Sequence, residues 1–68
     1  MGAVMDRPQA IRNGQRWAHW NKDRNDWDIF TVRDSSARGV KVEYESSQPP
    51  KTIFNYVFFE SCRFLGLD

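Results

Sequence analysis

The amino-acid sequence predicts a small, mainly β domain. Two aromatic-rich runs flank a polar insert between Gln15 and Val32, and apolar and charged residues alternate from Val40 to Glu45. Clusters of Asn, Asp, Ser and Gly separate these runs, as in short turns. Because a period of two is typical of half-buried strands, we expect antiparallel strands joined by polar turns.

The composition limits how such a domain can be stabilised. A chain of 68 residues forms one domain and buries only roughly 60% of its unfolded surface. Cys62 is the only cysteine and His19 the only histidine, so neither a disulfide nor a tetrahedral zinc site can form within one chain. The hydrophobic core must therefore be built mainly from aromatic side chains, namely three Trp, two Tyr and five Phe. We expect an aromatic core, no metal and no cofactor.

Charge and hydropathy bear on location and partners. Ten basic and nine acidic residues are interleaved along the chain, whereas a protein that relies on phosphate contacts normally shows a basic excess. No apolar run is long enough to span a bilayer, and residues 1–5 lack the features of a signal peptide. We expect a cytoplasmic protein with no membrane partner.

The first thirteen residues are predicted to form a flexible N-terminal arm. They show little periodicity and include Pro8, which disfavours a helix at the residue before it. Met5 is as plausible a translation start as Met1. Asn13-Gly14 is a turn signal, so a single domain is expected over residues 14–68.

The next segment predicts a hairpin. A strand over Gln15–Asn21 would place Trp17 and His19 on one face and Trp20 on the other. The polar insert Asn21–Asp26 forms the turn, and a second strand runs from Trp27 to Arg33. That strand places Phe30 and Val32 on one face and Trp27, Ile29 and Thr31 on the other.

A third strand follows a second turn. Asp34–Gly39 is rich in Ser and ends in a glycine that can adopt positive φ. From Val40, apolar side chains alternate with charged ones, which predicts an antiparallel strand with Val42 and Tyr44 facing the core.

Two interpretations fit the C-terminal third. Apolar spacing is compatible with a helix over residues 50–65, with Pro at its start and Gly66 after its end. The same residues are mostly strand formers. They also fit a strand over Lys51–Tyr56, a helical turn near Phe58–Ser61 and a last strand over Arg63–Leu67.

Four stretches mark the predicted strands and the end of the domain: Gly14-Gln-Arg-Trp17, Ile29-Phe-Thr-Val32, Val40-Lys-Val-Glu-Tyr44, and Phe59 with Cys62-Arg-Phe-Leu65. Together they resemble the small SH3-like barrel proteins of phages, prophages and plasmids. The stretch Trp17-Ala-His-Trp-Asn-Lys22 is also similar to the start of a small bacterial domain family of unknown function. The resemblance implies a barrel of about five short antiparallel strands with one helical turn near the C-terminus. The alternative is a three-stranded antiparallel sheet with a C-terminal helix over 50–65.

No residue pattern predicts catalysis. His19 titrates near neutrality, but its place between two tryptophans on a strand favours a packed histidine. Cys62 lies in an aromatic stretch where a buried, inert thiol is expected. Asp23, Asp26 and Asp28 lack the spacing of a calcium loop, so we expect them in a solvated turn.

Aromatic and basic residues of the hairpin form the candidate partner-binding site. The five candidates are His19, Trp20, Lys22, Arg24 and Trp27. Their rings could stack on an extended peptide or on single-stranded bases while the cations contact carboxylates or phosphates. SH3-like barrels commonly bind beside their first long loop, and the resemblance places residues 21–26 there. A domain this small is nevertheless expected to use at least two of its three tryptophans as core.

Three functional hypotheses follow. The first is a non-catalytic protein-interaction module, an accessory protein of a phage or mobile element that binds a protein partner through the aromatic hairpin. The second is a nucleic-acid-binding accessory protein, whose cations would be Arg12, Arg16, Lys22, Arg24 and Arg63. The third is a tetrameric barrel enzyme with its active site on a symmetry axis, as in plasmid-borne barrel reductases. The oligomeric state stays open.

Overall fold

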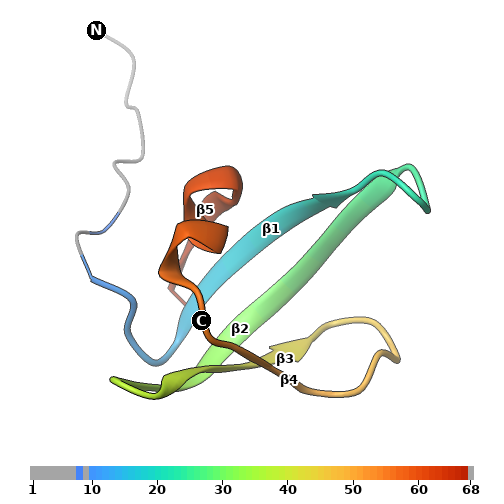
Figure 1. The fold of residues 1–68 in the computed structure, drawn as a ribbon. Coiled ribbons are helices and arrows are strands. Elements are labelled where there is room, and N and C mark those ends of the chain that lie inside the picture. Colours follow the sequence, from blue (N-terminus) through green and yellow to red (C-terminus); the bar gives the residue numbers. More distant parts are fainter. Residues whose placement is uncertain (1–7, 9, 68) are drawn as a thin grey trace, which may run out of the picture.

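The computed structural model describes residue 8 and residues 10–67, which form one antiparallel sheet and one 3₁₀ turn (Figure 1). The elements are β1 (Gln15–Asn21), β2 (Asp26–Ser36), β3 (Gly39–Tyr44), β4 (Lys51–Ile53), the 3₁₀ turn η1 (Tyr56–Ser61) and β5 (Arg63–Leu67). This confirms the mainly β prediction with five strands, whereas the sheet of the described residues is not closed into the predicted barrel, because β4 and β5 do not pair with each other. The alternative prediction of a helix over 50–65 is wrong. Across these residues, no helix is long and apolar enough to cross a membrane.

The N-terminal prediction falls mostly on residues that the structure does not describe. Residues 1–7, which include both candidate start methionines, and residue 9 lie outside the described part. Of the predicted arm, Ile11 packs against the core and the side chain of Gln15 donates to the carbonyl of Ala10.

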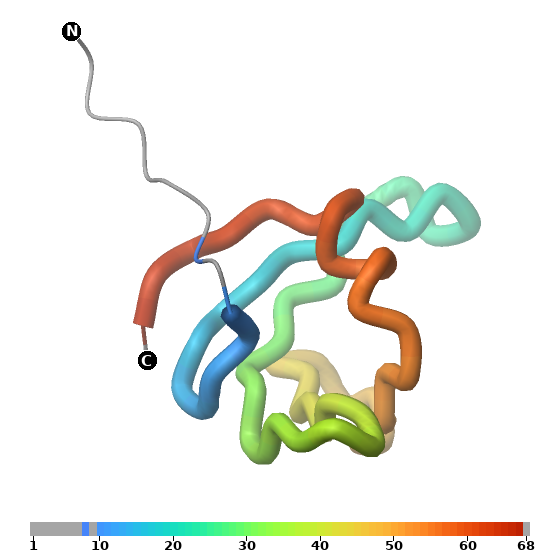
Figure 2. Tube along the Cα trace, turned by 60° about the vertical axis from the view of Figure 1, so that its left-hand side comes forward, coloured from blue at the N-terminus to red at the C-terminus, as the bar shows by residue number. Residues whose placement is uncertain are grey.

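The sheet has the strand order β4-β3-β2-β1-β5, with β4 and β5 as its two edges. The long strand β2 pairs with both of its neighbours along different parts of its length. Residues Asp26–Thr31 pair with β1, and residues Phe30–Ser36 pair with β3. A register shift between Val32 and Asp34 interrupts the second pairing. Figure 2 shows the η1 segment, in orange, crossing from the β4 end of the sheet to β5, which runs beside β1.

Two of the predicted turns are shorter than expected. Asn21 pairs with Asp26, so only the four residues between them form the first turn. The Asn21 side chain accepts from the backbone N–H of Asp23 (3.0 Å) and Arg24 (3.3 Å), and Asn25 adopts φ +55°. These side-chain bonds replace the ladder at the tip and close the turn.

The second turn comprises only residues 37 and 38. The prediction of a turn over Asp34–Gly39 is wrong at its start, because Ser35 and Ser36 pair with Val40 and Gly39. The register shift before Asp34 lets β2 continue into these polar residues. Gly39 has φ +150°, which agrees with the predicted positive φ.

The core lies between the sheet and η1. Its buried members are Trp17, Phe30, Val32, Val40, Val42, Ile53, Phe59 and Cys62. The ring of Trp17 packs at 5.2 Å from both Phe59 and Phe64, edge-to-face with the former and tilted to the latter. The alternation predicted for β3 is confirmed, since Val40 and Val42 are fully buried and Tyr44 packs against the core.

A single turn replaces the alternative helix for a local reason. Asn55 caps η1 by accepting from the backbone N–H of Val57 (2.9 Å), and the turn ends where Cys62 N–H donates to the Phe59 carbonyl (3.2 Å). A continuous helix would have placed Phe54 and Val57 on the buried stripe. Both are exposed here, while Phe59 enters the core.

Candidate functional site

Trp20 and Trp27 form an exposed pair at the outer end of the first hairpin. They are directly opposite in the register of β1 and β2, and their rings meet edge-to-face with centroids 5.3 Å apart. Their exposed fractions are 42% and 39%. The guanidinium of Arg63, at the start of β5, lies 5.3 Å from the centroid of Trp27. We call Trp20, Trp27 and Arg63 the tryptophan face.

The strand pattern explains why these rings stay outside the core. Trp17 and His19 point to the side of the sheet that η1 covers, so Trp20 points to the opposite side. The ladder between β1 and β5 ends at Ala18, so the hairpin continues past the edge strand (Figure 1). The expectation that at least two tryptophans belong to the core is therefore wrong, because only Trp17 does.

Asp28 ties the two loops beside this hairpin together. Its buried carboxylate accepts from Asn21 Nδ2 (3.1 Å) and from Gln48 Nε2 (3.1 Å), and it forms an ion pair with Arg24. The prediction that the aspartates are solvated holds for Asp23 and Asp26, which are exposed, and is wrong for Asp28, which is buried. The register places Asp28 opposite His19, on the covered side of the sheet.

His19 stacks on Phe58 of η1. The two ring centroids lie 4.5 Å apart with an interplanar angle of 30°. Partial burial, and secondly the charge of Lys51, lower the pKa of His19 below its ordinary value of 6.5. The imidazole is therefore neutral at pH 7 and packs as an aromatic ring, as the sequence predicted for a packed histidine.

A groove of about 640 Å³ separates the hairpin from the loop between β3 and β4. Its lining includes His19, Trp20 and Lys22 on one side and Pro49 and Lys51 on the other. We call it the hairpin groove. Trp20 belongs both to this groove and to the tryptophan face, so the two surfaces adjoin.

Four of the five predicted site residues lie on these two adjoining surfaces, and the fifth, Arg24, lies on neither. Trp20 and Trp27 form one, while His19 and the exposed Lys22 line the other. Arg24 points to Asp28 and holds the turn in place, so its charge is already matched within the chain.

Of the five cations considered for nucleic-acid binding, two are already paired with carboxylates of the chain. Arg16 is paired with Glu45, and Arg24 with Asp28. Arg63 lies over Trp27, while Arg12 is exposed in the segment before β1.

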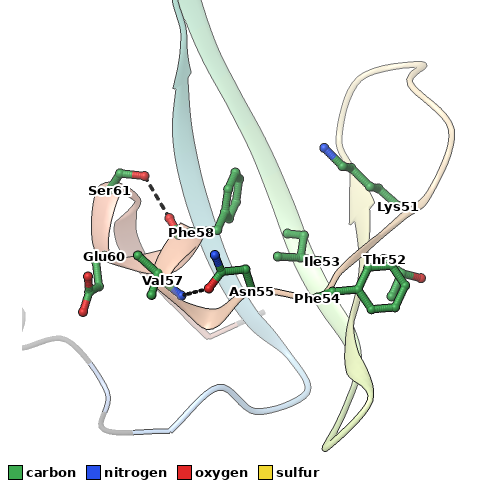
Figure 3. A pocket seen from close by; sticks show the side chains of 9 residues that line it. All are labelled: Lys51, Thr52, Ile53, Phe54, Asn55, Val57, Phe58, Glu60 and Ser61. Atoms are coloured by element: carbon green, nitrogen blue, oxygen red, sulfur yellow. Dashed lines mark hydrogen bonds between the residues drawn. The ribbon is translucent and has the colours of Figure 1, made fainter.

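A second apolar surface, which the sequence analysis did not single out, lies beside β4 and η1. Phe54 and Val57 are 76% and 60% exposed, and a groove of about 740 Å³ runs between them. Figure 3 shows Lys51 and Phe54 on the β4 side and Val57 on the η1 side. We call it the β4–η1 groove. The sequence does contain an indication of this surface, because Ile53–Phe59 has more apolar side chains than one helical turn can bury.

No cluster of three or more His, Cys, Asp or Glu side chains that could hold a metal occurs within residues 8 and 10–67. Cys62 is buried, and its Sγ lies 3.3 Å from the carbonyl oxygen of Phe58. Comparisons of the chain with models of protein families, with curated proteins and with solved structures found no match.

Proposed function

We propose that this chain is a non-catalytic protein-interaction module that binds a protein partner through the tryptophan face. The observation that carries the proposal is the edge-to-face pair of Trp20 and Trp27, exposed at the end of a hairpin that extends past β5. Large aromatic side chains and Arg are the residues that most often dominate the energy of protein interfaces.

The arrangement of the pair suits binding. Each ring is held by its neighbour, and Trp27 is also held by Arg63, so little side-chain entropy is lost when a partner covers them. The hairpin groove adjoins Trp20 and offers Lys22 and neutral His19 as polar contacts. A partner segment with an apolar anchor and a carboxylate matches these surfaces.

We further propose that the sheet belongs to the SH3-like barrels. The support is the strand order β4-β3-β2-β1-β5, the long β2 shared by both halves, and the 3₁₀ turn directly before the last strand. The origin in a phage or another mobile element remains a prediction from the resemblance.

Selection of peptides from a random library on immobilised wild-type protein tests the binding proposal. Selected peptides should bind in solution and shift the tryptophan emission to shorter wavelength, because the exposed rings become covered. Trp20→Ala and Trp27→Ala should each weaken binding at least about tenfold. Phe54→Ala, at the other apolar surface, is the matched control and should bind like wild type. Equal affinities for all four proteins would contradict the proposal.

Nucleic-acid binding is the second candidate, favoured by the contact between Arg63 and Trp27. A cation beside a stacking surface is what single-stranded bases and their phosphates require. The test is a titration of single-stranded oligonucleotides at increasing salt. Affinity that falls steeply with salt and is lost in Trp27→Ala would support this candidate, and no binding at low ionic strength would remove it.

A further inference from the structure

The two walls of the hairpin groove are joined to each other. The hairpin forms one wall, and the loop between β3 and β4 forms the other. Gln48 of that loop donates to the buried carboxylate of Asp28 in β2 (3.1 Å), and Pro49 and Pro50 restrict the backbone that follows. A ligand therefore meets walls that are already in place, which lowers the entropy cost of binding.

Two cations line this groove from opposite walls. Lys22 belongs to the hairpin wall and Lys51 to the other, and both are exposed. Neither forms an ion pair with another residue that the structure describes. The Lys51 ammonium points away from Phe54 (Figure 3), and its charge, after burial, lowers the pKa of His19 on the hairpin wall. The charge of Lys51 therefore acts across the groove.

Two further side chains of the lining can donate hydrogen bonds to a ligand. The His19 imidazole stacks on Phe58, and Tyr44 is half-buried. Among the described residues, neither side chain has a hydrogen-bond partner. A neutral imidazole has one N–H donor and a phenol has one O–H donor. The groove thus combines two cations with two neutral donors, which is a set that recognises an oxygen anion.

The carboxylates of the lining leave a small positive balance. Asp28 is buried, and its charge is matched by Arg24. Asp23 is exposed in the first turn and leaves one negative charge against the two lysines. A single carboxylate fits this balance. The successive phosphates of a nucleic acid fit it less well, because Asp23 repels them and they normally require a basic stripe.

We propose that the hairpin groove is a carboxylate site, which holds an acidic side chain of the partner segment between Lys22 and Lys51 while an apolar residue of the same segment covers Trp20. One extended segment can reach both places, because Trp20 belongs to the groove and to the tryptophan face. That the ligand is a protein segment rests on the proposed function. The further step is that this segment is acidic.

An NMR titration with the acetylated and amidated tripeptide glycyl-glutamyl-glycine tests the site without a selected partner. At low ionic strength it should shift the His19 signals with a dissociation constant on the order of 1–10 mM, and its glutamine analogue should not. Lys22→Gln and Lys51→Gln should each weaken binding about three- to tenfold. Lys41→Gln, an exposed lysine of β3 outside the lining, is the matched control and should bind like wild type.

Three results of this titration would overturn the proposal. They are the absence of a saturable shift, equal shifts by the glutamate and glutamine tripeptides, and an equal loss of binding in Lys41→Gln. A single-stranded oligonucleotide that shifts the same signals at lower concentration than the tripeptide would also overturn it, because the groove would then bind phosphates.

Peptide selection separates the carboxylate site from the proposed function. Peptides selected on wild type should carry an acidic residue, and its replacement by the amide should weaken binding as much as the double variant Lys22→Gln/Lys51→Gln does. Peptides that depend on Trp20 but bind the double variant like wild type would overturn the carboxylate site and leave the tryptophan face as the binding surface. Tripeptide binding without any selected peptide that depends on Trp20 would support the carboxylate site and remove the proposed function.

Discussion

Replacement of Asp28 by Asn should destabilise the fold far more than its position near an exposed turn implies. The buried carboxylate accepts from Asn21, Arg24 and Gln48, and thereby joins β1, the first turn and the β3–β4 loop. The amide of Asn presents a donor where a second acceptor is needed and removes the charge that attracts Arg24.

The size of the effect follows from those three bonds. A buried hydrogen bond to a charged group contributes about 1.5–3 kcal/mol. The side chain of Arg24 is 47% exposed, however, so in the variant it returns to water and its share is small. We expect a loss of about 2 kcal/mol in the free energy of unfolding, from a total of roughly 3–10 kcal/mol for a chain of this length. The melting temperature should fall by about 8–16 °C.

Urea denaturation followed by circular dichroism measures this loss. Asp23→Asn is the matched control, because it makes the same chemical change on an exposed side chain of the nearby first turn, and it should alter stability by less than about 0.5 kcal/mol. Gln48→Ala should lower the free energy of unfolding by less in the Asp28→Asn background than in wild type, since the carboxylate that accepts from Gln48 is already replaced there. If Asp28→Asn were as stable as Asp23→Asn, the role assigned to this carboxylate would be wrong.

Three further predictions concern single side chains. Because the folded state lowers the pKa of His19, the unfolded chain binds its proton more readily, so stability should fall as pH drops from about 7 through the lowered pKa. His19→Gln should flatten that dependence in urea titrations at different pH, and an unchanged slope would contradict it. Gly39→Ala should cost about 1–3 kcal/mol and more than Gly14→Ala, because both glycines have positive φ but only Gly39 has neighbours within 4 Å of an added Cβ. Thermal melts of both variants compare them directly. Trp17→Phe should leave fluorescence that acrylamide quenches readily, whereas Trp20→Phe should retain a protected component from Trp17; equal quenching would contradict the assigned burial.

The strand pattern was largely predictable because it depends on local alternation. In β3, Val40 and Val42 alternate with charged residues, and one face of this strand is buried, so sequence and structure agree. The C-terminal segment was harder, since Ile53, Val57 and Phe58 satisfy helix spacing as well as strand propensity. In the structure, Asn55 caps the start of a 3₁₀ helix that spans only Tyr56–Ser61, and the chain becomes extended again at Cys62.

The candidate site was less predictable because it depends on long-range contacts. Asp28 owes its burial to Gln48, which is twenty residues later in the chain, and to a register that the sequence does not reveal. Likewise, the exposure of Trp20 follows from where the pairing of β5 with β1 ends, and no local pattern indicates that position.

Some aromatic residues of this chain stabilise the fold, and others are exposed on its surface. Trp17 and Phe59 are fully buried, and truncating either would leave a cavity that costs about 3–5 kcal/mol, a large part of the stability of so small a domain. Trp20 and Phe54 lie on two different exposed surfaces, so truncation there removes contact area without opening the core. Variants at these exposed positions should therefore remain folded. For this reason, any loss of partner binding that they show can be assigned to the surface itself.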